Sequence, residues 1–308
     1  MLRAALISLS ESRGLRGWAE KSSLGQRVSG RFVAGTQLED ALRVAQSLNA
    51  TGMAVSVDNL GENVTNADEA RQSAALYKQL IAAMSARNLN ANVSLKLTHM
   101  GLDVDPNLAY DHVRTLVAQA AATQPKNFVR VDMEGSPYTH RTLDFVHELH
   151  RIPENRGCVG AVIQSYMRRS EADVAALLQD RIRIRLCKGA YKEPPEIAFQ
   201  AKSEVDGNYI RLMKMLLKSG IYHGLATHDV NIIREAQGFA IREKISRDTF
   251  EFQMLYGIRR DLQQSLVREG WRMRVYVPFG TEWYPYLMRR MAERPANLRF
   301  VLKNMLRG

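Results

Sequence analysis

Short apolar runs alternate along the chain with longer segments of helical period. Eight runs are rich in β-branched or apolar residues and are bounded by polar residues or glycine, which predicts strands. They cover residues 54–57, 92–96, 128–131, 160–164, 182–186, 224–226, 251–254 and 274–277.

Apolar residues three or four positions apart predict helices between these runs. The first covers residues 37–49, with Thr36 as N-cap and Glu39 completing a capping box. The others cover 67–86, 108–122, 142–150, 171–178, 207–217, 231–241, 259–269, 283–294 and 298–306. We also expect a short surface helix over residues 1–9.

The alternation of strands and helices predicts the fold class. Parallel strands need long crossovers, so strands separated by helices pair in parallel. Eight such units predict an α/β protein with a closed (β/α)8 TIM-type barrel over residues 36–308, after an N-terminal helical extension over residues 1–35. An open Rossmann sheet is disfavoured because Asp58-Asn59-Leu60-Gly61, after the first strand, begins no GxGxxG fingerprint.

Length and charge narrow the class further. The 308 residues exceed the roughly 250 that one barrel needs, which leaves room for the extension. A net charge of +11 favours an anionic membrane, nucleic acid or an anionic ligand as partner. We expect no nucleic acid, because the basic residues are dispersed. The two cysteines, Cys158 and Cys187, have no metal-ligand spacing, so we expect no metal and a reducing compartment.

Barrel enzymes carry their sites at the carboxyl ends of the strands, and several charges fall there. Lys96 and Arg185 interrupt apolar strands, and a buried cation needs a partner. By strand order, Asp132 and Glu134 are the nearest acidic candidates. The last helix carries Arg289-Arg290, two forked side chains that could converge on one small carboxylate.

Each of these signals also has an ordinary structural explanation. Paired arginines can form a solvated helix face, Lys96 and Arg185 can extend to the barrel rim, and His228 can be a satisfied core residue. Two other functions stay open. One is a metal-dependent barrel hydrolase, and the other is a basic scaffold that binds nucleic acid or membrane. The acidic and histidine ligands available to a hydrolase would be Asp58, Asp132, Glu134, His228 and Asp229.

Several motifs resemble one family in order and spacing. RLCKGAY, residues 185–191, resembles the fifth-strand motif of the proline dehydrogenase family. LATHD at 225–229 and FEFQMLYG at 250–257 resemble its sixth and seventh. YVPFG at 276–280, followed by Arg289-Arg290, resembles the eighth strand and the helix after it. The resemblance covers residues 30 to 305.

The resemblance implies a distorted barrel that holds FAD non-covalently and oxidises L-proline to 1-pyrroline-5-carboxylate. It also implies a membrane quinone as electron acceptor. The chain ends at Gly308, so it is similar to the monofunctional bacterial enzymes, whose product passes to a separate pyrroline-5-carboxylate dehydrogenase. We expect a cytoplasmic protein, with peripheral attachment to the inner face of the membrane left open.

The resemblance also implies roles for residues. Asp132 and Arg185 would be catalytic, the first as the anchor of the site and the second as a cation beside the flavin. Glu293 would act as a gate. Substrate contacts would come from Lys96, Tyr191, Leu255, Tyr276, Arg289 and Arg290. Flavin contacts would come from Met133, Gln164, Arg185, Lys188, Gly189, Ala190, Thr227 and His228, with Lys202 as a further candidate near the pyrophosphate. Lys192 departs from the tryptophan of some bifunctional relatives.

Overall fold

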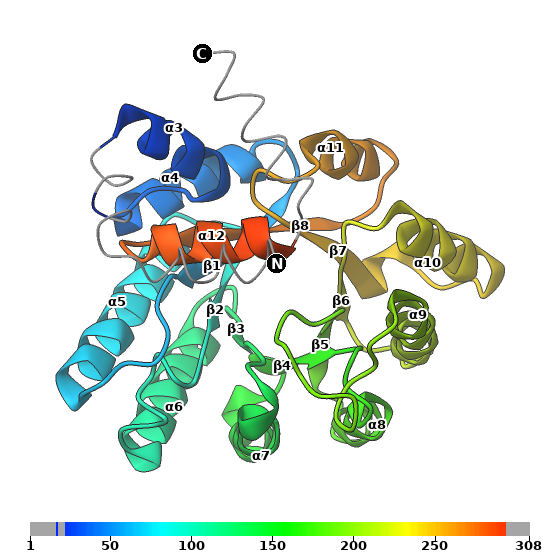
Figure 1. Ribbon diagram of the computed structural model, residues 1–308, viewed down its shortest axis with the longest axis horizontal. Coiled ribbons are helices and arrows are strands. Elements are labelled where there is room, and N and C mark those ends of the chain that lie inside the picture. The colour runs from blue at the N-terminus through cyan, green and yellow to red at the C-terminus, as the bar shows by residue number, and fades with distance from the viewer. Residues whose placement is uncertain (1–16, 18–21, 294–308) are drawn as a thin grey trace.

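Eight parallel strands close into a barrel, as the alternation predicted. The computed structural model describes residue 17 and residues 22–293. Each strand pairs with the next, and β8 pairs with β1 (Figure 1). The strands are β1 Ala54–Asn59, β2 Ala91–Leu95, β3 Val129–Val131, β4 Val159–Gln164, β5 Arg183–Cys187, β6 His223–Ala226, β7 Phe250–Leu255 and β8 Met273–Phe279. All eight predicted strands are confirmed, with bounds shifted by one or two residues.

Helices surround the barrel on its outer side (Figure 1). They are α5 Ala67–Ala86, α6 Pro106–Ala122, α7 Ser136–Arg151, α8 Ser170–Gln179, α9 Lys202–Lys218, α10 Val230–Arg242 and α11 Arg260–Arg268. Two short 3-10 helices, η1 Pro153–Asn155 and η2 Arg247–Thr249, lie in the connections. The predicted starts of α7 and α9, residues 142 and 207, lie several residues after the observed ones. Their first turns are mostly polar, so the apolar period becomes visible only in the second turn.

The helix that precedes the barrel, α4 Leu38–Asn49, begins one residue later than predicted. Its N-cap is Gln37, whose backbone N–H donates to Asp40 Oδ2 at 3.1 Å. The predicted Thr36 cap is therefore wrong, and Glu39 does not complete a capping box. Glu39 instead binds both terminal nitrogens of Arg87, at 2.8 and 2.9 Å.

Side chains alternate between two environments along the strands. One set packs with the helices in the main hydrophobic core, which includes Val55, Val57, Val93, Val131, Ile184, Leu186, Phe252 and Val275. Many of the intervening positions carry polar side chains on the other face of the strands, among them Ser56, Asp58, Ser94, Arg185, Gln253 and Tyr276, with Asp132 directly after β3. The interiors of such barrels are usually filled by branched apolar side chains. A polar interior therefore indicates that this space serves more than packing.

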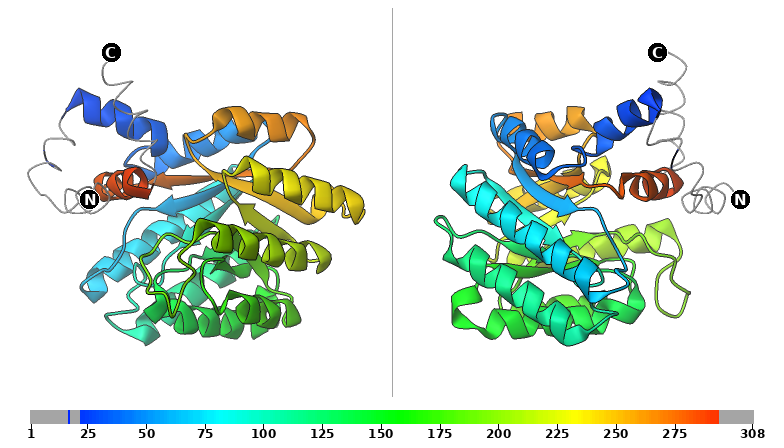
Figure 2. Two further views of the ribbon diagram at one scale, coloured as in Figure 1. Left: turned by 45° about the vertical axis from the view of Figure 1, so that its right-hand side comes forward. Right: turned by 90° about the vertical axis from the view of Figure 1, so that its left-hand side faces the viewer.

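Two further helices lie beside one end of the barrel. α12 Trp283–Glu293 lies next to α3 Ser23–Phe32 (Figures 1 and 2). They share a second apolar cluster, formed by Phe32, Val33, Leu60, Trp283, Tyr284, Tyr286, Leu287 and Met288. The division into an extension over 1–35 and a barrel over 36–308 stays a prediction. The helices predicted over 1–9 and 298–306 lie outside the described residues. Among the described helices, none has the length and apolar character needed to cross a membrane.

Candidate active site

A cavity of about 1310 Å³ opens at the carboxyl ends of the strands, and all eight strands or the loops after them contribute to its wall. The first turn of α12 borders it through Pro285 and Tyr286. The cavity brings together every predicted site residue outside α12: Lys96, Asp132, Met133, Gln164, Arg185, Lys188, Gly189, Ala190, Tyr191, Thr227, His228, Leu255 and Tyr276, as well as Lys202. The side chains of Arg289, Arg290 and Glu293 are not among those described.

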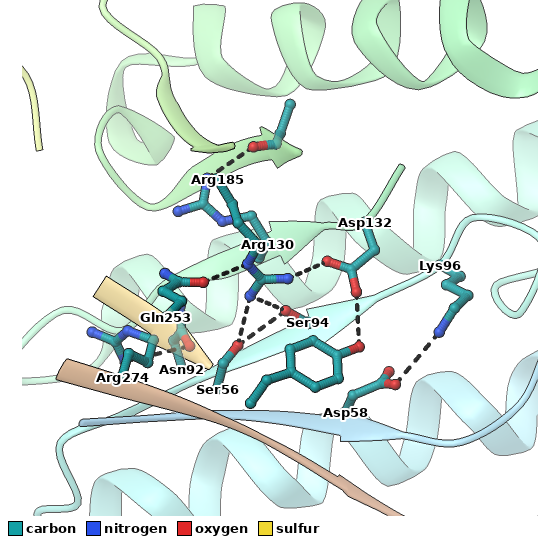
Figure 3. A network of polar contacts seen from close by, with 12 residues as sticks. Ser56, Asp58, Asn92, Ser94, Lys96, Arg130, Asp132, Arg185, Gln253 and Arg274 are labelled. Atoms are coloured by element: carbon teal, nitrogen blue, oxygen red, sulfur yellow. Dashed lines mark hydrogen bonds and ion pairs between the residues drawn. The ribbon is translucent and has the colours of Figure 1, made fainter. Parts of the chain in front are cut away.

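Arg185 lies at the centre of a buried polar network (Figure 3). Its Nη1 donates to Asp132 Oδ1 at 2.7 Å. Its Nη2 lies 3.0 Å from the Ser56 hydroxyl and 2.8 Å from that of Ser94. Its Nε donates to Gln253 Oε1 at 2.7 Å. Only 5% of the residue is exposed, so the guanidinium is held in one orientation by partners on β1, β2 and β7 and directly after β3.

Asp132 links this network to Tyr276 of β8. Its second oxygen, Oδ2, accepts a hydrogen bond of 2.8 Å from the Tyr276 hydroxyl. Burial, with the charges of Asp132 and Asp58, raises the pKa of Tyr276 well above its ordinary value. Tyr276 therefore keeps its proton and acts as a donor. The Arg185 guanidinium carbon lies 5.1 Å from the centre of the Tyr276 ring, within cation–π range.

Lys96 has a different partner from the one predicted. Its Nζ lies 3.4 Å from Asp58 Oδ2 and 3.9 Å from Glu62 Oε1. Burial alone would lower the pKa of Lys96, but Asp58, Glu62 and Asp132 together raise it above its ordinary value. Lys96 is therefore a cation at neutral pH.

The predicted partners of Lys96, Asp132 and Glu134, are engaged elsewhere. Asp132 accepts from Arg185 and Tyr276. Glu134 accepts from the Thr98 hydroxyl at 2.6 Å and from the Thr98 backbone N–H at 3.2 Å. The prediction took its candidates from β3, the strand that follows β2. Asp58 belongs to β1, which pairs with β2 on the other side.

The loop between β5 and α9 forms one wall of the cavity. Gly189 has a φ of +113°, and a Cβ there would lie 2.2 Å from the Tyr166 ring, so the wall can approach this closely only with glycine. Glu193 anchors the loop to the start of α7. Its Oε1 accepts from the Ser136 backbone N–H at 2.7 Å, and its Oε2 accepts from the Ser136 hydroxyl at 2.6 Å. This anchor holds Tyr191 beside the cavity.

Two lysines and two aspartates meet at the outer part of the same wall. Lys188 Nζ lies 2.5 Å from Asp206 Oδ1 and 2.9 Å from Asp229 Oδ2. Lys202 also contacts Asp206, and lies 3.5 Å from Asp229. Burial opposes ionisation of Asp229, but the hydrogen bond and charge of Lys188 outweigh it and lower its pKa to about 2. Both lysines are thereby held at the cavity.

Three polar side chains make contacts at the strand ends, and two of them, His228 and Gln164, join neighbouring strands. His228 Nε2 accepts from the Leu255 backbone N–H at 3.0 Å, which makes this nitrogen the unprotonated one. Thr227 Oγ1 accepts from the Asp229 backbone N–H at 3.1 Å. Gln164 Nε2 donates to the Glu134 backbone carbonyl at 3.0 Å. These contacts fix the spacing of the strand ends that form the cavity.

The site contains residues to which the sequence analysis gave no role in binding substrate or flavin. Ser56, Ser94 and Gln253 bind Arg185, and Asp58 binds Lys96. Asp58 and Gln253 both lie at strand ends, where the sequence places reactive residues, but Asp58 was considered only as a metal ligand. Ser56 could have been found from alternation, since it shares a face with Asp58.

The proposed ligand set of a metal hydrolase does not assemble. Within residue 17 and residues 22–293, no three histidine, cysteine, aspartate or glutamate side chains are grouped to hold a metal ion. Asp58, Asp132 and Asp229 are each paired with a lysine or arginine. A divalent cation would have to compete with these cations for the same oxygens.

Comparison with known proteins gives one consistent result. The family model described as Proline dehydrogenase matches residues 41–303. Proline dehydrogenase 1 of Bacillus subtilis (strain 168) is 40% identical over 308 residues, which is all of both chains. Proline dehydrogenase of Deinococcus radiodurans is 38% identical over 313 residues, covering 100% of this chain and 99% of the other.

A solved structure agrees with the observed fold. It is that of proline utilization A (PutA) from Bdellovibrio bacteriovorus inactivated by N-propargylglycine. It superposes with a TM-score of 0.81 and 27% identity, over 87% of this chain and 32% of that one. This chain thus spans about a third of that PutA's length.

Proposed function

The chain belongs to the proline dehydrogenase family, and from that premise we propose that its cavity binds FAD and L-proline side by side and that L-proline leaves as 1-pyrroline-5-carboxylate. The observation that supports this most is that all the predicted flavin and substrate residues outside α12 line one cavity. Oxidation of proline itself follows from the family.

The described residues fit FAD. The cavity, about 1310 Å³, exceeds the roughly 300–1,000 Å³ of ordinary ligand pockets, so it has room for a large cofactor and a small substrate. Lys188 and Lys202 suit an anionic pyrophosphate. Gly189 lets the wall approach closely without a side chain. Arg185 suits a ring system that gains negative charge. We propose that Met133, Gln164, Ala190, Thr227 and His228 complete the contacts.

When bound, FAD would supply the acceptor for a hydride from the ring carbon beside the proline nitrogen, and a route for the electrons to a final acceptor, which we propose to be a membrane quinone. The remaining steps belong to the protein. Arg289 and Arg290 of α12 clamp the substrate carboxylate, which makes the transfer effectively intramolecular. Glu293 acts as a gate at the same helix. Lys96 disfavours a second positive charge nearby and so favours the neutral amine that the reaction requires.

The inner residues stabilise the developing charge and exclude water. Arg185 offers a fixed cation where negative charge accumulates, and Asp132 keeps that cation in place. Tyr276, held by Asp132, lies against the ring of the substrate and disfavours a ring hydroxyl. Tyr191 and Leu255 form the apolar wall that shields the amine and ring from solvent.

Anaerobic titration of the purified protein with L-proline tests the proposal. We expect a yellow protein whose flavin absorbance is bleached by L-proline. A colourless protein with no affinity for added FAD, or a yellow protein that L-proline leaves oxidised, would refute it. Arg289→Met is the matched variant, and we expect it to need far more proline for the same bleaching.

We further propose a cytoplasmic protein that meets its quinone at the inner face of the membrane and releases its product to a separate pyrroline-5-carboxylate dehydrogenase. The net charge of +11 supports attraction to anionic lipid. Co-sedimentation with anionic and neutral vesicles tests the first part. Equal recovery with both kinds of vesicle would contradict it.

A further inference from the structure

Gln253 of β7 contacts Arg185, and the sequence analysis gave it no role in binding substrate or cofactor. Its Oε1 accepts from Arg185 Nε at 2.7 Å, and only 4% of the residue is exposed. The other two guanidinium nitrogens bind Asp132 and the two serines. Gln253 is thus the partner that completes the set around Arg185 (Figure 3).

The orientation of the Gln253 amide is determined by its second neighbour. Its Nε2 donates to Glu251 Oε1 at 2.7 Å. Glu251 in turn accepts from Arg274 Nε at 2.6 Å and from the Tyr222 hydroxyl at 2.7 Å. Burial would raise the pKa of Glu251, but Arg274 outweighs it and lowers that pKa, so Glu251 is ionised. Arg185 offers only donors and an ionised Glu251 only acceptors, so the amide has one favourable orientation.

The neighbouring strand leaves room for this amide. Gly224 of β6 pairs in register with Glu251. A Cβ at Gly224 would lie 2.3 Å from Gln253 Nε2. Any larger residue at that position would push the amide away from Arg185 or Glu251. Gly224 and the Glu251 carboxylate therefore together determine where the Gln253 amide meets Arg185 Nε.

We propose that Gln253 is a positioning residue, which sets the plane of the Arg185 guanidinium at the cavity wall and thereby its effect on the flavin. The proposal rests on the proposed function, in which Arg185 stabilises the reduced cofactor. Because the Gln253 side chain is neutral, its removal changes the position of the cation without changing the net charge of the site. An effect on the flavin after its removal would therefore come from geometry.

The first test is the reduction potential of the bound flavin in Gln253→Met, a variant of similar volume that cannot accept the hydrogen bond. We expect reduced flavin to be stabilised about tenfold less, which for a two-electron couple is a shift of about 30 mV to more negative potential. We expect kcat to fall while KM for proline changes little. Gly224→Ala, which displaces the same amide from another strand, should shift the potential in the same direction.

The matched control is Asn155→Leu. Asn155 is a buried amide, 2% exposed, that donates to the Leu149 carbonyl at 3.2 Å and does not line the cavity. This variant should lose stability but keep the potential of the wild type. An unchanged potential in Gln253→Met and Gly224→Ala would overturn the proposal, whatever their stability.

The second test needs no flavin. Unfolding of the apoprotein is compared for Gln253→Met, Arg185→Met and the double variant. If Gln253 holds Arg185, the losses should be non-additive, with a coupling of about tenfold in the unfolding constant. Additive losses would overturn the proposal. Failure of the proposed function would look different, because the wild-type protein itself would then bind no flavin or not be reduced by proline.

Discussion

Replacement of Asp132 by alanine is the most informative single change in the site. The carboxylate accepts from Arg185 Nη1 at 2.7 Å and from the Tyr276 hydroxyl at 2.8 Å. The exposed fractions of the Arg185 and Asp132 side chains are 6% and 14%, so water replaces the carboxylate poorly. Strand order predicted Asp132 as a partner of the buried cations Lys96 and Arg185, and the structure shows that its removal releases Arg185 and Tyr276 but not Lys96.

The expected loss of stability depends on the hydrogen bonds that Arg185 keeps in the variant. Breaking a buried ion pair by removing one partner costs about 3–5 kcal/mol. Arg185 keeps the Ser56, Ser94 and Gln253 acceptors, so we expect the lower figure, about 3 kcal/mol of unfolding free energy. Displacement of catalytic groups by about 1 Å costs roughly 100-fold in rate, so we expect at least that loss in kcat for proline oxidation.

Urea unfolding and steady-state proline oxidation measure the two effects. Asp132→Asn should lie between alanine and wild type, because it keeps an acceptor oxygen but loses the charge. The matched control is Asp103→Ala, which removes an exposed aspartate that accepts from the Tyr138 hydroxyl at 2.9 Å. It should cost less than about 1 kcal/mol and leave turnover intact. Stability within 1 kcal/mol of wild type together with normal turnover in Asp132→Ala would refute this reasoning.

Three further predictions concern His99, the β5–α9 loop and the clamp proposed for Arg290. Burial lowers the pKa of His99 to about 4, whereas the unfolded chain binds this proton near pH 6.5. As the pH falls from 6.5 to 4, the free energy of unfolding should therefore fall by at most about 3 kcal/mol. Urea unfolding at several pH values should show a flatter profile for His99→Gln. Glu193→Ala and Ser136→Ala should each loosen the β5–α9 loop and raise KM for proline several-fold with little change in Tm. A KM equal to that of the wild type in both variants would count against the anchor. Arg290→Met should raise KM for proline at least tenfold in steady-state assays with little change in kcat, whereas unchanged KM would remove it from the clamp.

The fold could be predicted because its signals are local and repeated. Each strand and helix carries its own apolar period, and eight repeats of one unit leave few topologies. The errors concern helix starts, because these segments are mostly polar and show no apolar period. The first turns of α7 and α9 are mostly polar, and the start of α4 depended on which of two adjacent polar residues serves as the cap.

The site could be predicted only as a set of residues that meet at one rim. Their pairing could not, because strand order makes β1 and β3 equally near to Lys96, and only the closed geometry selects Asp58. Ser56, Ser94 and Gln253 carry no charge, so nothing in their residue type distinguishes them from ordinary polar residues. Their importance comes from Arg185, whose interruption of an apolar strand was the visible signal.

The purpose of the polar network around Arg185 can be tested by comparing its contributions to stability and to chemistry. Removing one partner of a buried pair is costly, yet replacing both partners by apolar residues of similar shape is often neutral or stabilising. We therefore expect Asp132→Leu and Arg185→Met to destabilise the protein singly, whereas the triple change with Gln253→Met should restore the unfolding free energy to within about 1 kcal/mol of wild type.

In the triple variant the Ser56 and Ser94 hydroxyls, 3.0 Å apart, can bond to each other. The Tyr276 hydroxyl loses Asp132 but still has the Asp58 carboxylate as an acceptor. Urea unfolding and proline turnover should then separate the two roles, with stability recovered and activity lost. A triple variant less stable than either single variant would mean that the network chiefly holds the barrel together. Recovery of stability without activity would instead show that these buried charges are kept to hold one guanidinium in place for the reaction.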